Sequence, residues 1–115
     1  MRKPRLVVHY IMGKKPKNAI KVSPKKLDMI YENDPMLQFI VNEAKRKGIP
    51  EKEGFYYTKS SLKFIESEVG PKEFRKIRKR IKTVKRPSSN DYVFFIDPLT
   101  ETLYLRLPKR KFWYW

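Results

Sequence analysis

The sequence predicts a single α+β domain with strands near both ends of the chain and short helices between them. Three observations lead to this class. The chain has 115 residues, the usual size of one domain. Runs rich in Val, Ile and aromatic residues lie near the two ends, whereas apolar residues recur at helical spacing in between. Hydrophobic residues make up 40% of the chain, which suffices for a packed core and argues against a disordered basic tail.

The N-terminal part of the chain predicts a pair of strands at residues 5–12 and 19–22. Both segments are rich in Val and Ile, and segment 13–18, which contains glycine, proline and three lysines, separates them. We therefore expect two strands around a loop at 13–18.

Three or four short helices are expected next. Ser23 and Asp34 each precede a proline that suits the first helical turn, so each can cap a helix. The second of these two helices is expected over 35–47, where apolar residues form one stripe. A further helix is expected over 59–69, and Gly70 separates it from the next.

A basic helix is predicted over residues 71–86. Its apolar residues recur at spacings of three, four and three and share one face: Phe74, Ile77, Ile81 and Val84. Basic residues fill the opposite face, so the helix would present a cationic ridge. The major groove of B-DNA is about 12 Å wide and admits such a helix. Contact with phosphates alone, and an ordinary solvated helix, are the alternatives.

The chain is expected to end in a β-hairpin with strands at 92–96 and 102–107. Two helices joined at Gly70 and followed by a hairpin give an element order similar to that of a winged-helix domain, over about residues 34–107. The similarity is architectural. It departs from the usual helix-turn-helix because Pro71 follows Gly70 directly and leaves almost no turn.

The charge of the chain is concentrated in two blocks. With 28 Lys and Arg against 12 Asp and Glu, the net charge is +16. Residues 1–26 hold nine basic residues and no acid, and residues 71–86 hold nine basic residues and one acid, so the rest of the chain is nearly neutral. A net charge of about 2–8 suffices for the solubility of a small domain. We therefore expect a polyanionic partner, and nucleic acid first.

Several classes of protein and site are excluded. The absence of cysteine excludes a disulfide scaffold, a thiol nucleophile and Cys-containing zinc sites. A single histidine, His9, excludes a multi-histidine metal centre, and we expect no metal or other cofactor. No run of about 18 apolar residues exists, and the apolar run at 6–12 is too short for a signal peptide. We expect a cytoplasmic protein with no membrane partner.

The residues suited to catalysis are few, and we name no catalytic residue. Asp91, Asp97 and Glu101 flank the expected hairpin, where carboxylates could hold a divalent metal. A common nuclease arrangement would have a lysine at Leu103, and Asp97 before a proline is a good turn opener. We interpret His9 as a strand residue rather than a general base.

The C-terminal region leaves further interpretations open. Small metal-independent ribonuclease toxins are basic α+β domains, and the segment from Asp91 to the C-terminus is similar to their last strands. The similarity implies proton transfer and phosphate neutralisation by Tyr104, Arg106, Lys109 and Arg110. The final aromatic residues can close the core, stack on bases at about 1–3 kcal/mol each, or contact a protein partner; their sequence is Phe112-Trp113-Tyr114-Trp115.

We therefore predict a non-enzymatic nucleic-acid-binding protein, a transcription regulator or a packaging protein. It would contact duplex DNA in preference to RNA with the basic helix at 71–86, supported by the basic N-terminal block. An RNA-binding or ribosome-associated protein and the ribonuclease are the alternatives, and a homodimer is left open. The expected binding residues are all basic: Lys14, Lys15, Lys17, Lys72, Arg75, Lys76, Arg78, Lys79, Arg80, Lys82, Arg86, Lys109, Arg110 and Lys111.

Overall fold

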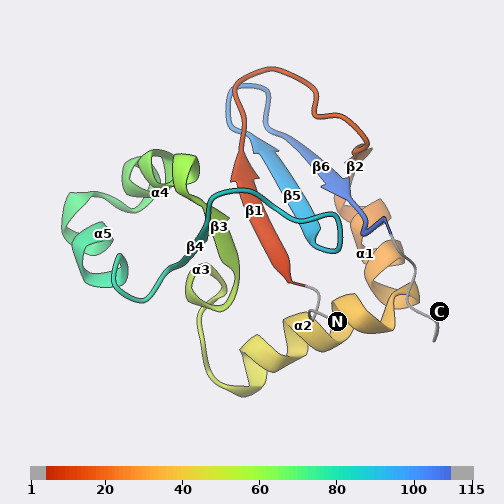
Figure 1. Ribbon diagram of the computed structural model, residues 1–115, viewed down its shortest axis with the longest axis horizontal. Coiled ribbons are helices and arrows are strands. Elements are labelled where there is room, and N and C mark those ends of the chain that lie inside the picture. The colour runs from red at the N-terminus through yellow and green to blue at the C-terminus, as the bar shows by residue number, and fades with distance from the viewer. Residues whose placement is uncertain (1–4, 110–115) are drawn as a thin grey trace.

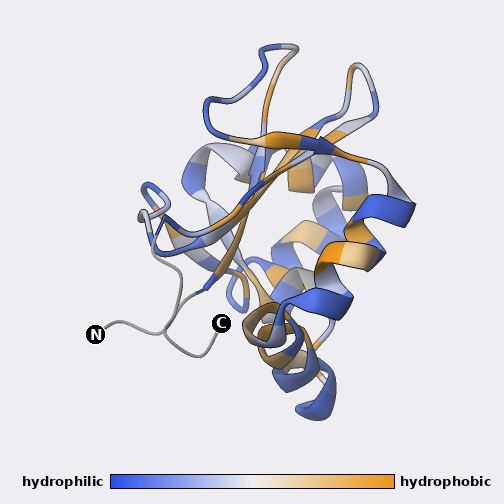
Figure 2. Cartoon of the chain, turned by 90° about the vertical axis from the view of Figure 1, so that its right-hand side faces the viewer, coloured by the Kyte–Doolittle hydropathy of each residue, from blue (hydrophilic) through white to orange (hydrophobic). Residues whose placement is uncertain are grey.

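A computed structural model of the protein describes residues 5–109, apart from the side chains of residues 51 and 52. One six-stranded sheet carries its longer helices on a single face (Figures 1 and 2). The predicted α+β class is therefore confirmed. Within residues 5–109, no helix combines the length and the apolar character needed to cross a membrane.

The sheet is built around the first strand of the chain. Its strand order is β2-β6-β5-β1-β3-β4, and the strands are β1 Leu6–Tyr10, β2 Ile20–Val22, β3 Tyr56–Thr58, β4 Lys82–Val84, β5 Tyr92–Asp97 and β6 Thr102–Arg106. β1 pairs in parallel with β3 and with β5, β3 pairs in parallel with β4, and β6 is antiparallel to both β5 and β2. Three consecutive residues of β1, Leu6, Val7 and Val8, are buried, as is usual for a parallel strand covered on both faces.

The two N-terminal strands form but do not pair with each other. β5 and β6 lie between β1 and β2, and β2 pairs instead with β6, with Lys21 opposite Tyr104. The two predicted strands are therefore confirmed, but they do not form a hairpin with each other. Two strands that are neighbours in the sequence can be separated by strands from the other end of the chain, and a local pattern cannot show this insertion.

The helices begin where their caps were predicted. They are α1 Pro24–Asn33, α2 Pro35–Arg46, the single turn α3 Glu51–Gly54, α4 Leu62–Val69 preceded by the 3₁₀ turn η1 Lys59–Ser61, and α5 Pro71–Ile77. Ser23 Oγ accepts from the backbone N–H of Lys26 at 3.2 Å, and Asp34 Oδ1 accepts from that of Leu37 at 3.1 Å. Both caps are confirmed.

The predicted basic helix is wrong beyond residue 77. α5 ends at Ile77, residues 78–81 form a turn, and residues 82–84 form β4, the edge strand beside β3. The apolar spacing does not distinguish the two outcomes, because Ile81 is buried at 6% exposure where it enters the strand. Hydrogen bonds to β3 favour an extended backbone at residues 82–84. These bonds involve a distant segment, so the local spacing of apolar residues cannot predict them.

The winged-helix order is not confirmed. The C-terminal hairpin forms, but β5 pairs in parallel with β1 along its length, from Leu6 opposite Tyr92 to Tyr10 opposite Ile96. The hairpin therefore belongs to the central sheet and does not project from a helical core as a wing (Figure 1).

The face of the sheet without the longer helices is crossed by residues 85–91, which we call the strap (Figure 1). β4 and β5 run in the same direction on either side of β3 and β1, so their connection must cross both strands. Arg106 Nη2 donates to the carbonyl of Ser88 at 2.7 Å, and Arg5 forms an ion pair with Asp91 at 2.9 Å. These two contacts hold the strap against this face.

Candidate nucleic-acid interface

One edge of the molecule collects the basic residues of the second charged block. They come from α5, the following turn, β4 and the start of the strap, and every one is exposed. We call this set the cationic edge: Lys72, Arg75, Lys76, Arg78, Lys79, Arg80, Lys82, Lys85 and Arg86. Clustered exposed cations raise the local positive potential more than the same charges spread over the surface.

Acidic side chains neutralise only a small part of the cationic edge. Glu73 lies 3.5 Å from Lys76 Nζ, and Glu53 lies 3.0 Å from Arg80 Nη2. Within residues 5–109, no ion pair engages the other seven cations. Exposed ion pairs contribute only about 0–1 kcal/mol, so the cationic edge is largely available to an anionic ligand.

The junction between α4 and α5 orients the cations of α5. Gly70 has φ 89° and ψ 155°, a backbone conformation open essentially only to glycine, and Pro71 begins α5 directly after it. Phe74 and Ile77 pack against the core cluster beneath α4. The apolar side of α5 is thereby held by the core, and its cations remain outside.

Two cations lie close to the ring of Tyr56, and one of them, Lys82, belongs to the cationic edge. The guanidinium carbon of Arg5 is 4.9 Å from the centre of the Tyr56 ring, and Lys82 Nζ is 5.4 Å from it. Tyr56 and Lys82 are neighbours because they stand opposite each other in the β3–β4 ladder. No local pattern in the sequence indicates this cation–π cluster, since only strand pairing brings the three residues together.

Three lysines of the basic N-terminal block lie toward the other edge of the sheet, whereas Arg5 of the same block lies beside Tyr56 near the cationic edge. Lys14, Lys15 and Lys17 are exposed in the connection to β2, which is the edge strand opposite β4. The strand order places β2 and β4 five spacings apart, or about 24 Å at ~4.8 Å per spacing. The structure therefore separates Lys14, Lys15 and Lys17 from the cationic edge.

The remaining basic residues lie at the C-terminal end. Lys109 is exposed, and its backbone N–H donates to the carbonyl of Ser89 in the strap at 2.8 Å. Arg110 and Lys111 lie outside the described residues.

The residues suggested for a ribonuclease are used in packing and in holding the strap. Tyr104 packs against the small core cluster that contains Val93 and Phe95. Arg106 donates to the strap carbonyl of Ser88. Of the two remaining candidates, Lys109 is exposed and Arg110 lies outside the described residues.

His9 takes part in a buried chain of hydroxyl groups. His9 Nδ1 lies 2.6 Å from Thr58 Oγ1, which lies 2.7 Å from Ser61 Oγ, and Ser61 Oγ accepts from the backbone N–H of Tyr10 at 2.9 Å. Ser61 is fully buried, so its hydroxyl must donate to Thr58, and Thr58 must donate to His9 Nδ1.

This chain of hydrogen bonds assigns a neutral His9 that carries its proton on Nε2. Burial lowers the pKa of His9 from its usual value, in agreement with the neutral form. Thr58 is only 2% exposed, which keeps its hydroxyl away from a substrate. We infer that this network stabilises the contact of β1 with β3 and with the start of α4, and that it has no catalytic role.

Asp91 and Asp97 do not form a shared metal site. Asp91 and Asp97 stand near opposite ends of β5, too far apart to share a metal ion. Asp97 Oδ1 accepts from the backbone N–H of Leu99 at 3.0 Å, which confirms its interpretation as a turn opener. Within residues 5–109, no group of three or more His, Cys, Asp or Glu could hold a metal ion.

No family model, curated protein or solved structure matches this chain.

Proposed function

We propose that the protein is a non-enzymatic nucleic-acid-binding protein that contacts duplex DNA through the cationic edge. One observation carries this proposal: nine basic side chains from consecutive elements are exposed on one edge, and only two of them have an acidic partner among residues 5–109. Nucleic acid is the abundant polyanion that such a surface fits, since its phosphates lie at close and regular spacing.

The elements of the cationic edge favour contact with the DNA backbone. α5 has seven residues and is about 10 Å long at 1.5 Å per residue, much shorter than the helix expected over 71–86. Its cations continue into a turn and a strand, so they spread along the edge instead of projecting from one helix face. Contacts with phosphates position a protein without reading sequence, and we therefore favour a packaging role over a sequence-specific regulator.

Two triple variants of equal charge test this surface. The first is Arg75→Gln, Arg78→Gln and Lys79→Gln in the cationic edge. The second, Lys14→Gln, Lys15→Gln and Lys17→Gln, removes three charges from the opposite edge of the sheet. Binding to a labelled 20-bp duplex is measured by fluorescence anisotropy over a range of KCl concentrations.

We expect the logarithm of the binding constant of the wild type to fall with the logarithm of salt concentration by about 0.9 per phosphate contacted. The cationic-edge triple should lower this slope by about 2–3 and weaken binding about tenfold or more at moderate salt. The loop triple should change both quantities much less. Equal losses in the two triples, or binding that does not respond to salt, would contradict the proposal.

The preference for DNA is tested in the same assay with an unlabelled RNA hairpin of equal charge as competitor. The proposal expects duplex DNA to compete at lower concentration than the hairpin. Stronger competition by the hairpin would overturn the DNA assignment and favour the RNA-binding alternative. Shortening of the hairpin during prolonged incubation with the pure protein would overturn the non-enzymatic assignment.

A further inference from the structure

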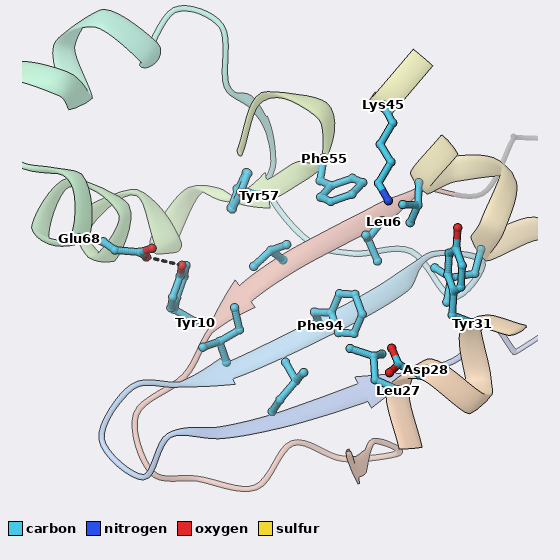
Figure 3. A pocket seen from close by; sticks show the side chains of 15 residues that line it. Leu6, Tyr10, Leu27, Asp28, Tyr31, Lys45, Phe55, Tyr57, Glu68 and Phe94 are labelled. Carbon is cyan, nitrogen blue, oxygen red and sulfur yellow. Dashed lines mark hydrogen bonds between the residues drawn. The ribbon is translucent and has the colours of Figure 1, made fainter. Parts of the chain in front are cut away.

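A groove of about 540 Å³ opens on the helical face of the sheet (Figure 3). β1, β3, β5 and β6 supply its floor, α1 and α2 supply one wall, and α4 contributes to the opposite side. Its volume lies in the range of about 300–1,000 Å³ that is typical of ligand pockets.

The groove exists because the helices cover the sheet in two separate pairs. α4 and α5 pack over a core cluster that includes Val8, Tyr57 and Ile65, and α1 and α2 pack over one that includes Leu6 and Leu37. Partly buried Phe94 contacts both clusters. The groove follows the seam between these clusters, so its floor is mostly apolar and combines aliphatic with aromatic side chains.

The charged residues that line the groove are mostly acidic, in contrast with the rest of the chain. Asp28 of α1 and Glu68 of α4 lie on opposite sides of it, and Lys45 of α2 is the one described cation in its lining (Figure 3). Glu68 Oε2 accepts a hydrogen bond of 2.8 Å from the Tyr10 hydroxyl. The groove thus combines an apolar floor that includes Tyr10, Tyr57 and Phe94 with a net negative rim, which fits a ligand that is both aromatic and cationic.

The end of this chain has that chemistry. After Lys109 come two cations and four consecutive aromatic residues, with the sequence Arg110-Lys111-Phe112-Trp113-Tyr114-Trp115. Lys109 is bonded to Ser89 in the strap, on the face of the sheet opposite the groove. Six residues span at most about 20 Å, and the sheet lies between the strap, where they start, and the groove of the same molecule. The groove of another molecule has no such barrier.

We propose that the groove receives residues 110–115 of a second copy of this chain. The aromatic side chains lie on the apolar floor, and Arg110 and Lys111 face the carboxylates of Asp28 and Glu68. Each copy offers one segment and one groove, so mutual exchange closes a symmetric dimer. This surface is distinct from the cationic edge and does not depend on the proposed binding of nucleic acid.

Tryptophan fluorescence can report whether residues 110–115 are buried in a dimer. Trp113 and Trp115 are its only two, so tryptophan fluorescence reports on this segment alone. We expect light scattering to show a dimer at high protein concentration and a monomer on dilution, in nuclease-treated protein free of nucleic acid. The tryptophan emission should shift to longer wavelength over the same concentration range, because the rings become exposed to water as the dimer dissociates.

A charge-reversal experiment locates the contact. The groove variant Asp28→Lys with Glu68→Lys should weaken dimerisation about tenfold or more. Its matched control, Glu32→Lys with Glu66→Lys, reverses two exposed carboxylates on the same two helices outside the groove lining and should weaken it less than threefold. Adding Arg110→Glu and Lys111→Glu to the groove variant restores opposite charges and should recover dimerisation.

Several outcomes would overturn the inference. One is a monomer with unchanged tryptophan emission at every concentration. Another is short-wavelength emission that persists in the monomer, which would place the segment in its own molecule. Equal weakening by the groove and control variants would show that net charge, and not the groove, governs association. The cationic-edge triple variant should dimerise like the wild type, so failure of this inference and failure of the proposed function are distinguishable.

Discussion

At the scale of single residues, Asp91 organises the face of the sheet that the strap crosses. It is fully buried, forms two hydrogen bonds with the guanidinium of Arg5, and accepts from the backbone N–H of Ser88 at 2.8 Å. One carboxylate thus connects the start of β1, the strap and the start of β5. The sequence suggested Asp91 as a possible metal ligand, but both of its carboxylate oxygens accept hydrogen bonds from Arg5 or Ser88.

Substitution of Asp91 tests this role. We expect Asp91→Ala to lower the free energy of unfolding by about 3 kcal/mol, because it leaves the mostly buried Arg5 guanidinium unpaired and the Ser88 N–H without its acceptor. Urea denaturation measures the change. Glu73→Ala, which breaks an exposed ion pair with Lys76, should cost less than about 1 kcal/mol. Similar costs for the two variants would contradict the assigned role.

His9 makes the stability depend on pH. Burial lowers the pKa of His9 below 6.5, so between that lowered value and about 6.5 the unfolded chain binds more protons than the folded one. The free energy of unfolding should therefore fall as the pH is lowered from about 7 to about 5. His9→Asn keeps an acceptor for Thr58 but does not titrate, and denaturation at several pH values should show a flatter dependence over this window. An unchanged dependence would exclude His9 as its source.

At the scale of elements, the junction between α4 and α5 determines where the cationic edge points. The two helices meet at Gly70 with no intervening loop, and α5 is anchored through Phe74 and Ile77. Seven residues are too few for a stable isolated helix, so α5 depends on this junction and this packing. The direction of its cations is therefore a property of the tertiary structure.

Gly70→Ala tests the junction. The backbone at Gly70, with φ 89° and ψ 155°, strains any residue with a Cβ atom, although nothing lies within 4 Å of the position the Cβ would take. We expect a loss of about 1–3 kcal/mol in the free energy of unfolding, from backbone strain alone. Ser67→Ala, at an exposed position of α4, should stay within about 0.5 kcal/mol of the wild type. Chemical denaturation measures both changes. A similar loss in the two variants would indicate a general effect on α4 and not backbone strain at Gly70.

At the scale of the whole molecule, the net charge of +16 acts against folding as well as favouring polyanions. The cationic edge and the N-terminal lysines lie at opposite edges of the sheet, which reduces repulsion between the two blocks. Within the cationic edge, however, nine cations have only two ion-pairing acids among the side chains that the structure describes. Repulsion there is relieved by counterions or by a bound polyanion.

The melting temperature should therefore rise with salt. Between about 20 and 300 mM KCl, screening of exposed charges should add about 1 kcal/mol, or roughly 4 °C, to the stability of a domain of this size. Differential scanning calorimetry measures the change. The triple variant of Arg75, Arg78 and Lys79 should show a smaller rise because it carries less repulsion. A melting temperature that falls with salt would show that attractive ion pairs outweigh the repulsion.

Local features of this protein could be predicted because they depend on a few neighbouring residues. Ser23 and Asp34 cap α1 and α2 as expected, since a capping side chain bonds to backbone groups two or three residues away. The strands of the hairpin and the two basic blocks follow in the same way from segments of the chain. By itself, the sequence thus determined the α+β class, the starts of the helices and the amount of charge in each block.

The tertiary structure decided which segments become neighbours. β5 and β6 insert between β1 and β2, residues 82–84 join β3 as a strand, and the lysines at 14, 15 and 17 lie far from the cationic edge. The groove, too, arises only where two helix pairs meet one sheet. These features depend on hydrogen bonds and packing between residues far apart in the sequence. A local pattern compatible with both helix and strand, as at Ile81, is resolved only when the partner strand is in place.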